Sequence, residues 1–283
     1  MVVILLPIDC KGTGKRFMDS YIVSEITEGL FMIGMERPCH VTISTFDIDM
    51  RLFMTDFYDP QNTYDIWYWY IDGSYTVSNL PTNVRLHQLE KNHAKFWYIE
   101  SDRQIRFVVT SANMTPQMTH NCMQSFVSIT AQRSQVSEEI VRDYNVKLDK
   151  FFSVYGMRLD MGLYKMVIDK LIYNLPNRVN GIERWFMKQD DLLVDSNNIT
   201  LSYLPMVKKT AVVRTSVPTS NKVIAYYSQD KVSEKTTVIK IPYSYDFHYK
   251  LYYTHKCLLV SSNNFSYNHK NNYELGILLY EQK

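Results

Sequence analysis

The 283-residue chain has 46% hydrophobic and 21% charged residues, close to the averages of soluble globular domains. Its 31 basic and 29 acidic residues leave a formal net charge of +2, too small to indicate nucleic-acid binding by overall charge alone. The four cysteines, at positions 10, 39, 122 and 257, show no paired spacing. They therefore predict neither a zinc site nor a disulfide framework, and a reduced intracellular compartment is expected.

The first apolar run, VVILLP at residues 2–7, predicts a strand. It has no basic n-region and no small-residue cleavage site, so we do not interpret it as a signal peptide. No segment reaches the roughly 18 apolar residues of a membrane span, so no membrane partner is expected.

Strand-like and helix-like runs alternate along the chain, which predicts the α/β class. In the first part, strands are expected at 39–48, 64–75 and 106–112, and amphipathic helices at 137–156 and 161–176. Further strands are expected at 210–217, 222–228, 236–243, 249–262 and 273–283. No low-complexity linker interrupts the chain. We therefore expect two packed halves, at residues 1–158 and 159–283.

A short motif occurs once in each half. Each copy runs His-x-Lys, an apolar strand, a turn of small hydroxyl residues, and then Asn-x-Ser/Thr. The residues are His93, Lys95, Asn113 and Thr115 in the first copy, and His248, Lys250, Asn264 and Ser266 in the second. A single His-x-Lys pair is usually a surface feature, whereas a repeat with Asn after the next strand indicates one composite site.

The residue types in this repeat suit phosphoryl transfer. The transition state spreads negative charge over the equatorial oxygens, which lysines and asparagine amides can stabilise. Two histidines can then take the roles of nucleophile and proton donor, because imidazole ionises near neutral pH. One attacks phosphorus as the neutral nucleophile, and the other donates a proton to the leaving oxygen. The lysines supply the positive charge, so we expect neither a metal nor a cofactor.

The paired motifs resemble those of the phospholipase D superfamily. That family usually has aspartate five residues after each lysine, but Glu100 and His255 stand there. The departure directs attention to a branch without this aspartate, the type 1 tyrosyl-DNA phosphodiesterases. The stretches VVTSANMT (108–115), LVSSNNFS (259–266) and YELGILL (273–279) resemble the signatures of that branch. The resemblance implies two similar α/β/α halves with mixed sheets packed together.

The resemblance also implies roles for the site residues. His93 would be the nucleophile that forms a phosphohistidine, and His248 the general acid and then base. The phosphate oxygens would be bound by Lys95, Lys250, Asn113 and Asn264. Gln124 would support the first histidine and Glu274 the second, while Thr115 and Ser266 would contact a neighbouring DNA phosphate.

The substrate implied by the resemblance is a DNA 3′ end that carries a tyrosyl or peptide adduct. RNA, a 5′ adduct, a phospholipase-D-type nuclease on single strands, and a catalytically weak DNA-end-binding module stay open as alternatives. One site built from two halves requires only a monomer. The compact size and the Tyr/Asn/Lys-rich composition suit a viral or AT-rich genome. We expect the nucleus, the cytoplasm or a viral replication site as the location.

Aromatic residues for base stacking are not placed by the sequence. The resemblance predicts an aromatic residue four positions before the first histidine, but Leu89 stands there. We interpret the run IWYWY at 66–70 as core and sheet surface rather than as a base-stacking platform.

Overall fold

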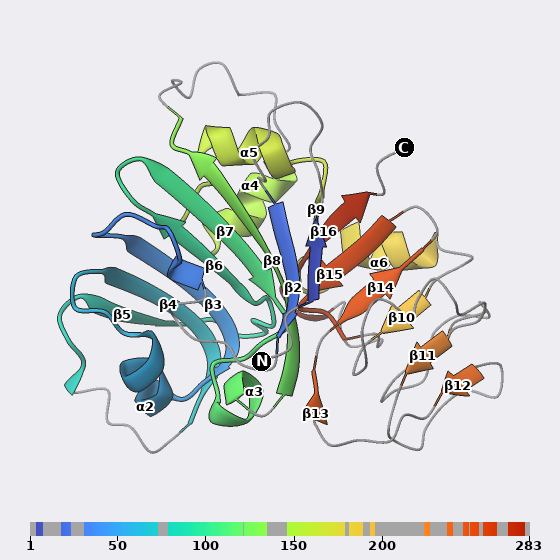
Figure 1. Ribbon diagram of the computed structural model, residues 1–283, viewed down its shortest axis with the longest axis horizontal. Coiled ribbons are helices and arrows are strands. Elements are labelled where there is room, and N and C mark those ends of the chain that lie inside the picture. Colours follow the sequence, from blue (N-terminus) through green and yellow to red (C-terminus); the bar gives the residue numbers. More distant parts are fainter. Residues whose placement is uncertain are drawn as a thin grey trace.

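The computed structural model describes residues 4–7, 18–23, 31–72, 79–120, 122–134, 146–178, 181–188, 193–195, 224–226, 237–239, 246–248, 250–254, 257–264 and 271–280. These residues form two β-sheets side by side, with helices packed on them (Figure 1). None of the helices in the described ranges is long and apolar enough to cross a membrane.

The larger sheet has nine strands and is built mainly from the first half of the chain. In spatial order its path is β1 (Ile4–Pro7), β2 (Met18–Val23), β8 (Cys122–Gln132), β7 (Gln104–Thr110), β6 (Phe96–Glu100), β3 (His40–Ile48), β4 (Thr63–Ile71) and β5 (Val84–Gln88). The short strand β13 (Asp246–Phe247) comes from the second half and pairs with β8 in parallel. Strands β3, β4 and β5 are mutually parallel, whereas β6, β7 and β8 are antiparallel, so the sheet is mixed.

The smaller sheet has seven strands, all from the second half. Its order is β12 (Thr237–Ile239), β11 (Ile224–Tyr226), β10 (Leu193–Asp195), β14 (Leu251–Tyr253), β15 (Cys257–Ser261), β16 (Glu274–Tyr280) and β9 (Leu171–Asn174). Strands β14, β15 and β16 are consecutive antiparallel neighbours. This arrangement confirms the mixed α/β class with two packed sheets.

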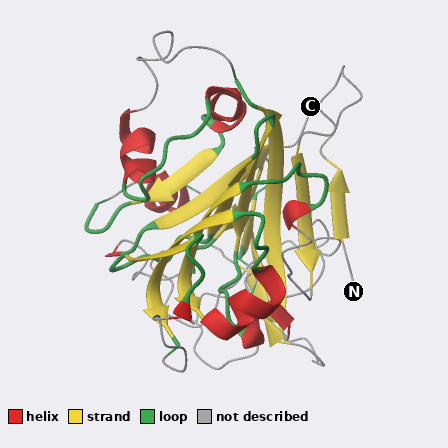
Figure 2. Cartoon of the chain, turned by 90° about the vertical axis from the view of Figure 1, so that its left-hand side faces the viewer, coloured by secondary structure: helices red, strands yellow, loops and turns green. Residues whose placement is uncertain are grey.

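Helices lie on both sides of the larger sheet (Figure 2). They are α2 (Met50–Leu52) with the π-helical turn η1 (Phe53–Phe57), α3 (Pro116–His120), α4 (Val146–Ser153) and α5 (Met161–Val167). Helix α6 (Gly181–Met187) packs on β9 of the smaller sheet. Two aspartates begin helices as N-caps: Asp49 accepts from the amides of Arg51 and Leu52, and Asp160 from that of Gly162.

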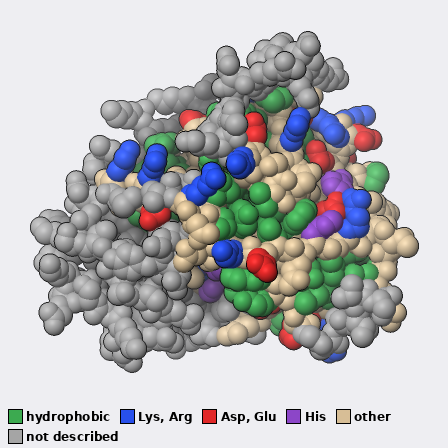
Figure 3. Space-filling view, turned by 180° about the vertical axis from the view of Figure 1, so that it is seen from behind, with side chains coloured by type: hydrophobic (Ala, Val, Ile, Leu, Met, Phe, Trp, Pro, Cys, Tyr) green, Lys and Arg blue, Asp and Glu red, His purple; other side chains and the backbone are tan. Residues whose placement is uncertain are grey.

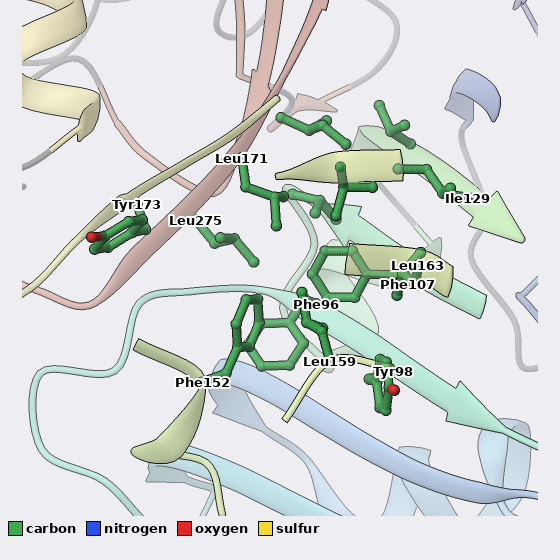
Figure 4. Close-up of a cluster of buried hydrophobic side chains, with 14 of the residues drawn as sticks. Phe96, Tyr98, Phe107, Ile129, Phe152, Leu159, Leu163, Leu171, Tyr173 and Leu275 are labelled. Atoms are coloured by element: carbon green, nitrogen blue, oxygen red, sulfur yellow. The ribbon is translucent and has the colours of Figure 1, made fainter. Parts of the chain in front are cut away.

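One hydrophobic core joins the two sheets. Figure 4 shows Leu171 and Leu275 of the smaller sheet beside Phe96 and Phe152 of the first half. Each of these side chains is at least nine-tenths buried, and burying one leucine or phenylalanine contributes about 1.5–3 kcal/mol. The halves are therefore one packed body, and residues at their junction are held in place from both sides.

A second core covers the opposite face of the larger sheet. There η1 places Phe53 and Phe57 against the sheet, and Phe31 packs edge-on against Trp97 and Phe126. With both faces covered, strands such as β6 and β7 are buried along most of their length. This explains why they appear in the sequence as nearly continuous apolar runs.

The strands predicted at 39–48 and 106–112 are confirmed as β3 and β7, and the one at 64–75 is confirmed as β4 up to Ile71, with residues 73–75 outside the described residues. The single strand predicted at 249–262 is wrong, because two antiparallel strands, β14 and β15, stand there. The strand predicted at 210–217 lies outside the described residues.

The helix predicted over 161–176 is wrong in its second part: α5 ends at Val167, and residues 171–174 form β9. This segment pairs with β16, and all four of its side chains are buried, so sheet pairing overrides the local helical pattern. Of the helix predicted at 137–156, residues 137–145 lie outside the described residues.

The division at residues 158 and 159 stays a prediction. Strands β8 and β9, on either side of it, belong to different sheets. However, β13 of the second half pairs with β8, and the Asp160 carboxylate accepts from the amide of Ser134 in the first.

The face in Figure 3 carries basic side chains among acidic and apolar ones, in keeping with the small net charge.

Candidate active site

His93 lies on the turn that leads into β6, not within the strand, which begins at Phe96. The preceding residue, Asn92, is fully buried and anchors this turn. Its amide uses all of its hydrogen-bonding positions. The partners are the carbonyls of Thr45 (3.0 Å) and Trp67 (3.1 Å) and the hydroxyls of Ser44 (3.2 Å) and Tyr155 (3.0 Å). The backbone before His93 is thus fixed to β3, β4 and the turn after α4.

The two lysines are held in the same way in the two copies of the motif. Lys95 donates from Nζ to the His93 carbonyl at 2.9 Å, and Lys250 donates to the His248 carbonyl at 2.6 Å. Both lysines are buried, with exposed fractions of 0% and 1%. A buried ammonium is costly unless charge or hydrogen bonds compensate it, so two at one place indicate a site for an anion.

The turns after the next strands match in detail. Ser111 and Ser262 each donate from the hydroxyl to a residue near the start of the following strand: to Gln124 Oε1 at 2.8 Å and to Glu274 Oε2 at 2.5 Å. Each hydroxyl also accepts from the next amide along that strand, that of Ser125 or Leu275. The repeat seen in the sequence is therefore a repeat of hydrogen bonds as well.

The support for the histidines is crossed between the halves, which corrects the pairing expected from the sequence. Glu274 Oε1, in the second half, lies 2.7 Å from Nδ1 of His93 in the first. His248 Nδ1 lies 3.1 Å from the Ser111 carbonyl of the first half. Strand β13 pairs with β8 so that Phe247 lies opposite Met123. The residue that follows β13 is His248, and the next along β8 is Gln124. The β13 pairing explains the position of His248, because β13 lies on the first sheet. Glu274 reaches His93 because the carbonyl of the preceding residue, Tyr273, accepts from the His93 amide.

Electrostatic coupling shows that the four basic residues share one site. Burial lowers the pKa of His93, the two lysines lower it further, and Glu274 opposes them. Burial lowers the pKa of His248 well below its usual value, and Lys250, Lys95 and His93 add to this. Each histidine thus responds to the lysine of the other half. Both shifts favour the neutral imidazole near pH 7.

The Lys95 ammonium has N–H groups that are available to bind a ligand. Burial lowers its pKa to about 8, against the opposing effects of Glu274 and Asp47. Of its three N–H groups, one serves the His93 carbonyl, and the described residues offer no further hydrogen-bond acceptor. The site core holds two lysines against one buried carboxylate, Glu274, whose pKa stays below its usual value because His93 and Lys95 outweigh its burial. A phosphodiester, with one negative charge, would balance this excess.

No protein-family model matches the sequence, and the search of curated proteins also found no match. Solved structures do match. The yeast tyrosyl-DNA phosphodiesterase has a TM-score of 0.55 at 13% identity, over 85% of this chain and 82% of that one. A mutant of that enzyme gives 0.58 at 12% identity, over 92% and 88%. The chain has the phospholipase-D-like fold of yeast tyrosyl-DNA phosphodiesterase.

A further match to this fold is polyphosphate kinase from Porphyromonas gingivalis. Its TM-score is 0.51 at 10% identity, over 92% of this chain but 44% of that one. Since all of these identities are low, the likeness concerns the fold, and the chemistry has to be argued from this chain's own residues.

On this tyrosyl-DNA phosphodiesterase fold, the remaining predicted site residues lie at different depths. Asn113 is half-buried, and its Oδ1 atom is buried without a hydrogen-bond partner in the described part of the chain. Asn264 is exposed. Thr115 is half-buried just before α3, and Ser266 lies outside the described residues. Glu100 ends β6, at the opposite end of that strand from Lys95, so it takes no part in the site.

Sequence reasoning missed three contributors to the site. Ser111 and Ser262 were seen only as part of a small-hydroxyl turn, although their recurrence two residues before each asparagine was a usable signal. Asn92 gave no signal, because its four partners come from distant segments. Leu89 packs against the core that joins the sheets, so it does not replace the missing aromatic.

Proposed function

We propose that the chain is a phosphodiesterase that hydrolyses the 3′-phosphotyrosyl bond of DNA–protein adducts through a phosphohistidine. The observation that carries the proposal is the crossed site: two histidines and two buried lysines, with the Glu274 carboxylate behind His93 and a backbone carbonyl behind His248. The fold shared with yeast tyrosyl-DNA phosphodiesterase supports the choice of substrate.

In the first step His93 is the nucleophile. With Nδ1 facing Glu274, its Nε2 is the atom left to attack phosphorus in line with the departing tyrosine oxygen. The N–P bond forms as the P–O bond to tyrosine breaks. The ring becomes cationic in the adduct, and the Glu274 carboxylate stabilises that charge.

His248 acts on the leaving side. The bound phosphodiester adds negative charge, which raises the pKa of His248 and offsets the two lysines. The protonated ring donates its proton to the tyrosine oxygen as the bond breaks. In the second step the neutral ring takes a proton from water, whose oxygen attacks phosphorus. The N–P bond then breaks and a DNA 3′-phosphate leaves.

The equatorial oxygens are bound by four groups in the proposal. Lys95 and Lys250 supply charge, and Asn113 and Asn264 donate amide N–H groups. Thr115 and Ser266 extend the contacts to a neighbouring phosphate. Since the lysines provide the positive charge, turnover is expected to continue in EDTA.

The test is release of tyrosine from a single-stranded oligonucleotide with a 3′-phosphotyrosine, in EDTA. Wild-type protein should release it, and His93→Ala should not. Parallel assays use the 5′-linked isomer, an RNA version and an unmodified strand. Cleavage of the unmodified strand with the adduct left intact would favour the nuclease. Binding of the substrate without any turnover would favour the DNA-end-binding module.

A further inference from the structure

One aromatic side chain adjoins the first histidine, and two more adjoin that side chain in turn. Phe46, on β3, meets the His93 ring edge-on with centroids 5.0 Å apart. The Phe46 ring also lies 5.7 Å from Nζ of Lys95, a cation–π distance. Trp69 and Tyr70, on β4, lie 5.6 and 5.2 Å from Phe46. We call Phe46, Trp69 and Tyr70 the aromatic platform.

The aromatic platform is not explained by core packing. None of its rings is fully buried, and Tyr70 is 51% exposed. Trp69 and Tyr70 stack with centroids 5.0 Å apart and planes only 19° from parallel. Their strand neighbours Tyr68 and Ile71 pack against the second core, whereas Trp69 and Tyr70 belong to neither core. The interpretation of the run at 66–70 as core and sheet surface therefore fits its first three residues, and Trp69 and Tyr70 depart from it. Partly exposed stacked rings beside a buried cation suit a planar ligand that also carries negative charge.

We infer that the aromatic platform stacks the base of the nucleotide that stays on the enzyme, an inference that rests on the proposed function. Base stacking on aromatic side chains tolerates any sequence, because every base has a π-face. The inference makes a single-stranded or frayed DNA 3′ end the substrate, since a base within a duplex has its faces covered.

The geometry of in-line displacement indicates that the aromatic platform contacts the base rather than the tyrosine. The nucleophile and the leaving group lie on opposite sides of phosphorus, so the tyrosine departs on the side away from His93. The retained sugar is an equatorial substituent and lies nearer to His93. Since Phe46 contacts the His93 ring itself, the platform lies on the side of the retained nucleotide.

The test is equilibrium binding, which does not require turnover. Fluorescence anisotropy compares a single-stranded oligonucleotide ending in a 3′-phosphate with the same strand whose terminal nucleotide is abasic. Wild-type protein should bind the intact strand more tightly. Tyr70→Ala and Trp69→Ala should each lower the affinity ratio roughly 5- to 150-fold, the value of one base stack. Tyr70→Phe should retain the ratio, because it keeps the ring.

The matched control is Tyr280→Ala. Tyr280 is 50% exposed but lies six residues beyond Glu274 on β16, about 20 Å along the strand. It should leave the affinity ratio unchanged. Circular dichroism of each variant verifies the fold, and Tyr70, half exposed, is the substitution least able to disturb it.

Two results would overturn the inference. One is an affinity ratio that neither Tyr70→Ala nor Trp69→Ala changes, or wild-type protein that binds the intact and abasic strands equally well. The other is a loss of affinity in the variants that depends on a 3′-phosphotyrosyl group on the oligonucleotide and not on the terminal base. That result would assign the rings to the leaving group. If the ratio responds as expected but tyrosine is never released, the proposed function fails while the platform stands. If tyrosine is released but the ratio does not respond, the platform alone fails.

Discussion

The copy of the motif at His93 and the copy at His248 are built on matching hydrogen bonds but differ in what lies behind the histidine. Nδ1 of His93 faces a carboxylate, Glu274, whereas Nδ1 of His248 faces the Ser111 carbonyl and lies 3.1 Å from Lys250 Nζ. The equivalent of Glu274 in the first half is Gln124, a neutral amide. The same framework therefore carries one histidine that is stabilised as a cation and one that is not.

The carboxylate behind His93 suits that histidine to the covalent step, and its absence behind His248 suits His248 to proton transfer. A phosphohistidine keeps its positive charge for the lifetime of the intermediate, so it benefits from a carboxylate neighbour. His248 donates a proton in the first step and accepts one in the second. Its pKa therefore has to rise when the substrate binds and fall again when the leaving group departs. The crossing also means that neither half holds a complete site, because each supplies the support for the other's histidine.

The largest effect is expected from exchanging the carboxylate. Glu274→Gln keeps the shape but removes the charge behind His93, and kcat should fall on the order of 10²- to 10⁴-fold. Gln124→Ala removes a neutral hydrogen bond worth about 1 kcal/mol and should lower kcat roughly fivefold. Steady-state kinetics on the 3′-phosphotyrosyl oligonucleotide make the comparison. Equal losses in the two variants would contradict the assigned asymmetry.

A smaller effect is expected from the turn that holds the first copy. Asn92→Leu removes four hydrogen bonds at a buried position, so the free energy of unfolding should fall by roughly 2–4 kcal/mol. Urea denaturation measures the loss. A fall in kcat with little change in KM should accompany it, since the turn positions His93 and binds no substrate. Asn83→Leu is the control, because that amide is also hydrogen-bonded but lies away from the site. A KM effect larger than the kcat effect would count against a positioning role.

The buried cation of the first copy should make stability depend on pH. The pKa of Lys95 is about 8 in the folded protein and 10.5 in its unfolded reference, so the unfolded chain binds more protons between these values. Stability from this group therefore rises as the pH goes from 8 to 10.5, by up to about 3 kcal/mol. Relative to Lys95→Met, wild-type protein should gain that amount. Lys150→Met, an exposed substitution on α4, is the control for the loss of one lysine charge. A flat difference for Lys95→Met would mean that this lysine is not desolvated.

Much of this arrangement was readable in the sequence. The two copies of the motif could be found because both strands that follow are buried apolar runs, and such runs end at predictable turns. Asn113 and Asn264 could be placed after those strands for the same reason. The fold class followed from the alternation of strands and helices.

The crossing could not be predicted. Spacing along the chain associates Gln124 with His93 and Glu274 with His248, since each pair belongs to one half. Only the pairing of β13 with β8 brings His248 to the first half's turn. Strand β9 was missed for a related reason: its neighbour β16 is about a hundred residues later in the chain, and local periodicity does not record it. Phe46 gave no signal, because its relation to His93 exists only across the sheet.

The most direct test of the two-histidine account is to stop the reaction between its steps. His248→Asn removes the base of the second step, so it should accumulate a covalent protein–DNA adduct with the 3′-phosphotyrosyl oligonucleotide. Denaturing gel electrophoresis detects the adduct, and mass spectrometry of its peptides should place the phosphorus on His93. The double variant His93→Ala, His248→Asn should form none. An adduct on any other residue, or none with His248→Asn while wild type turns over, would contradict the account.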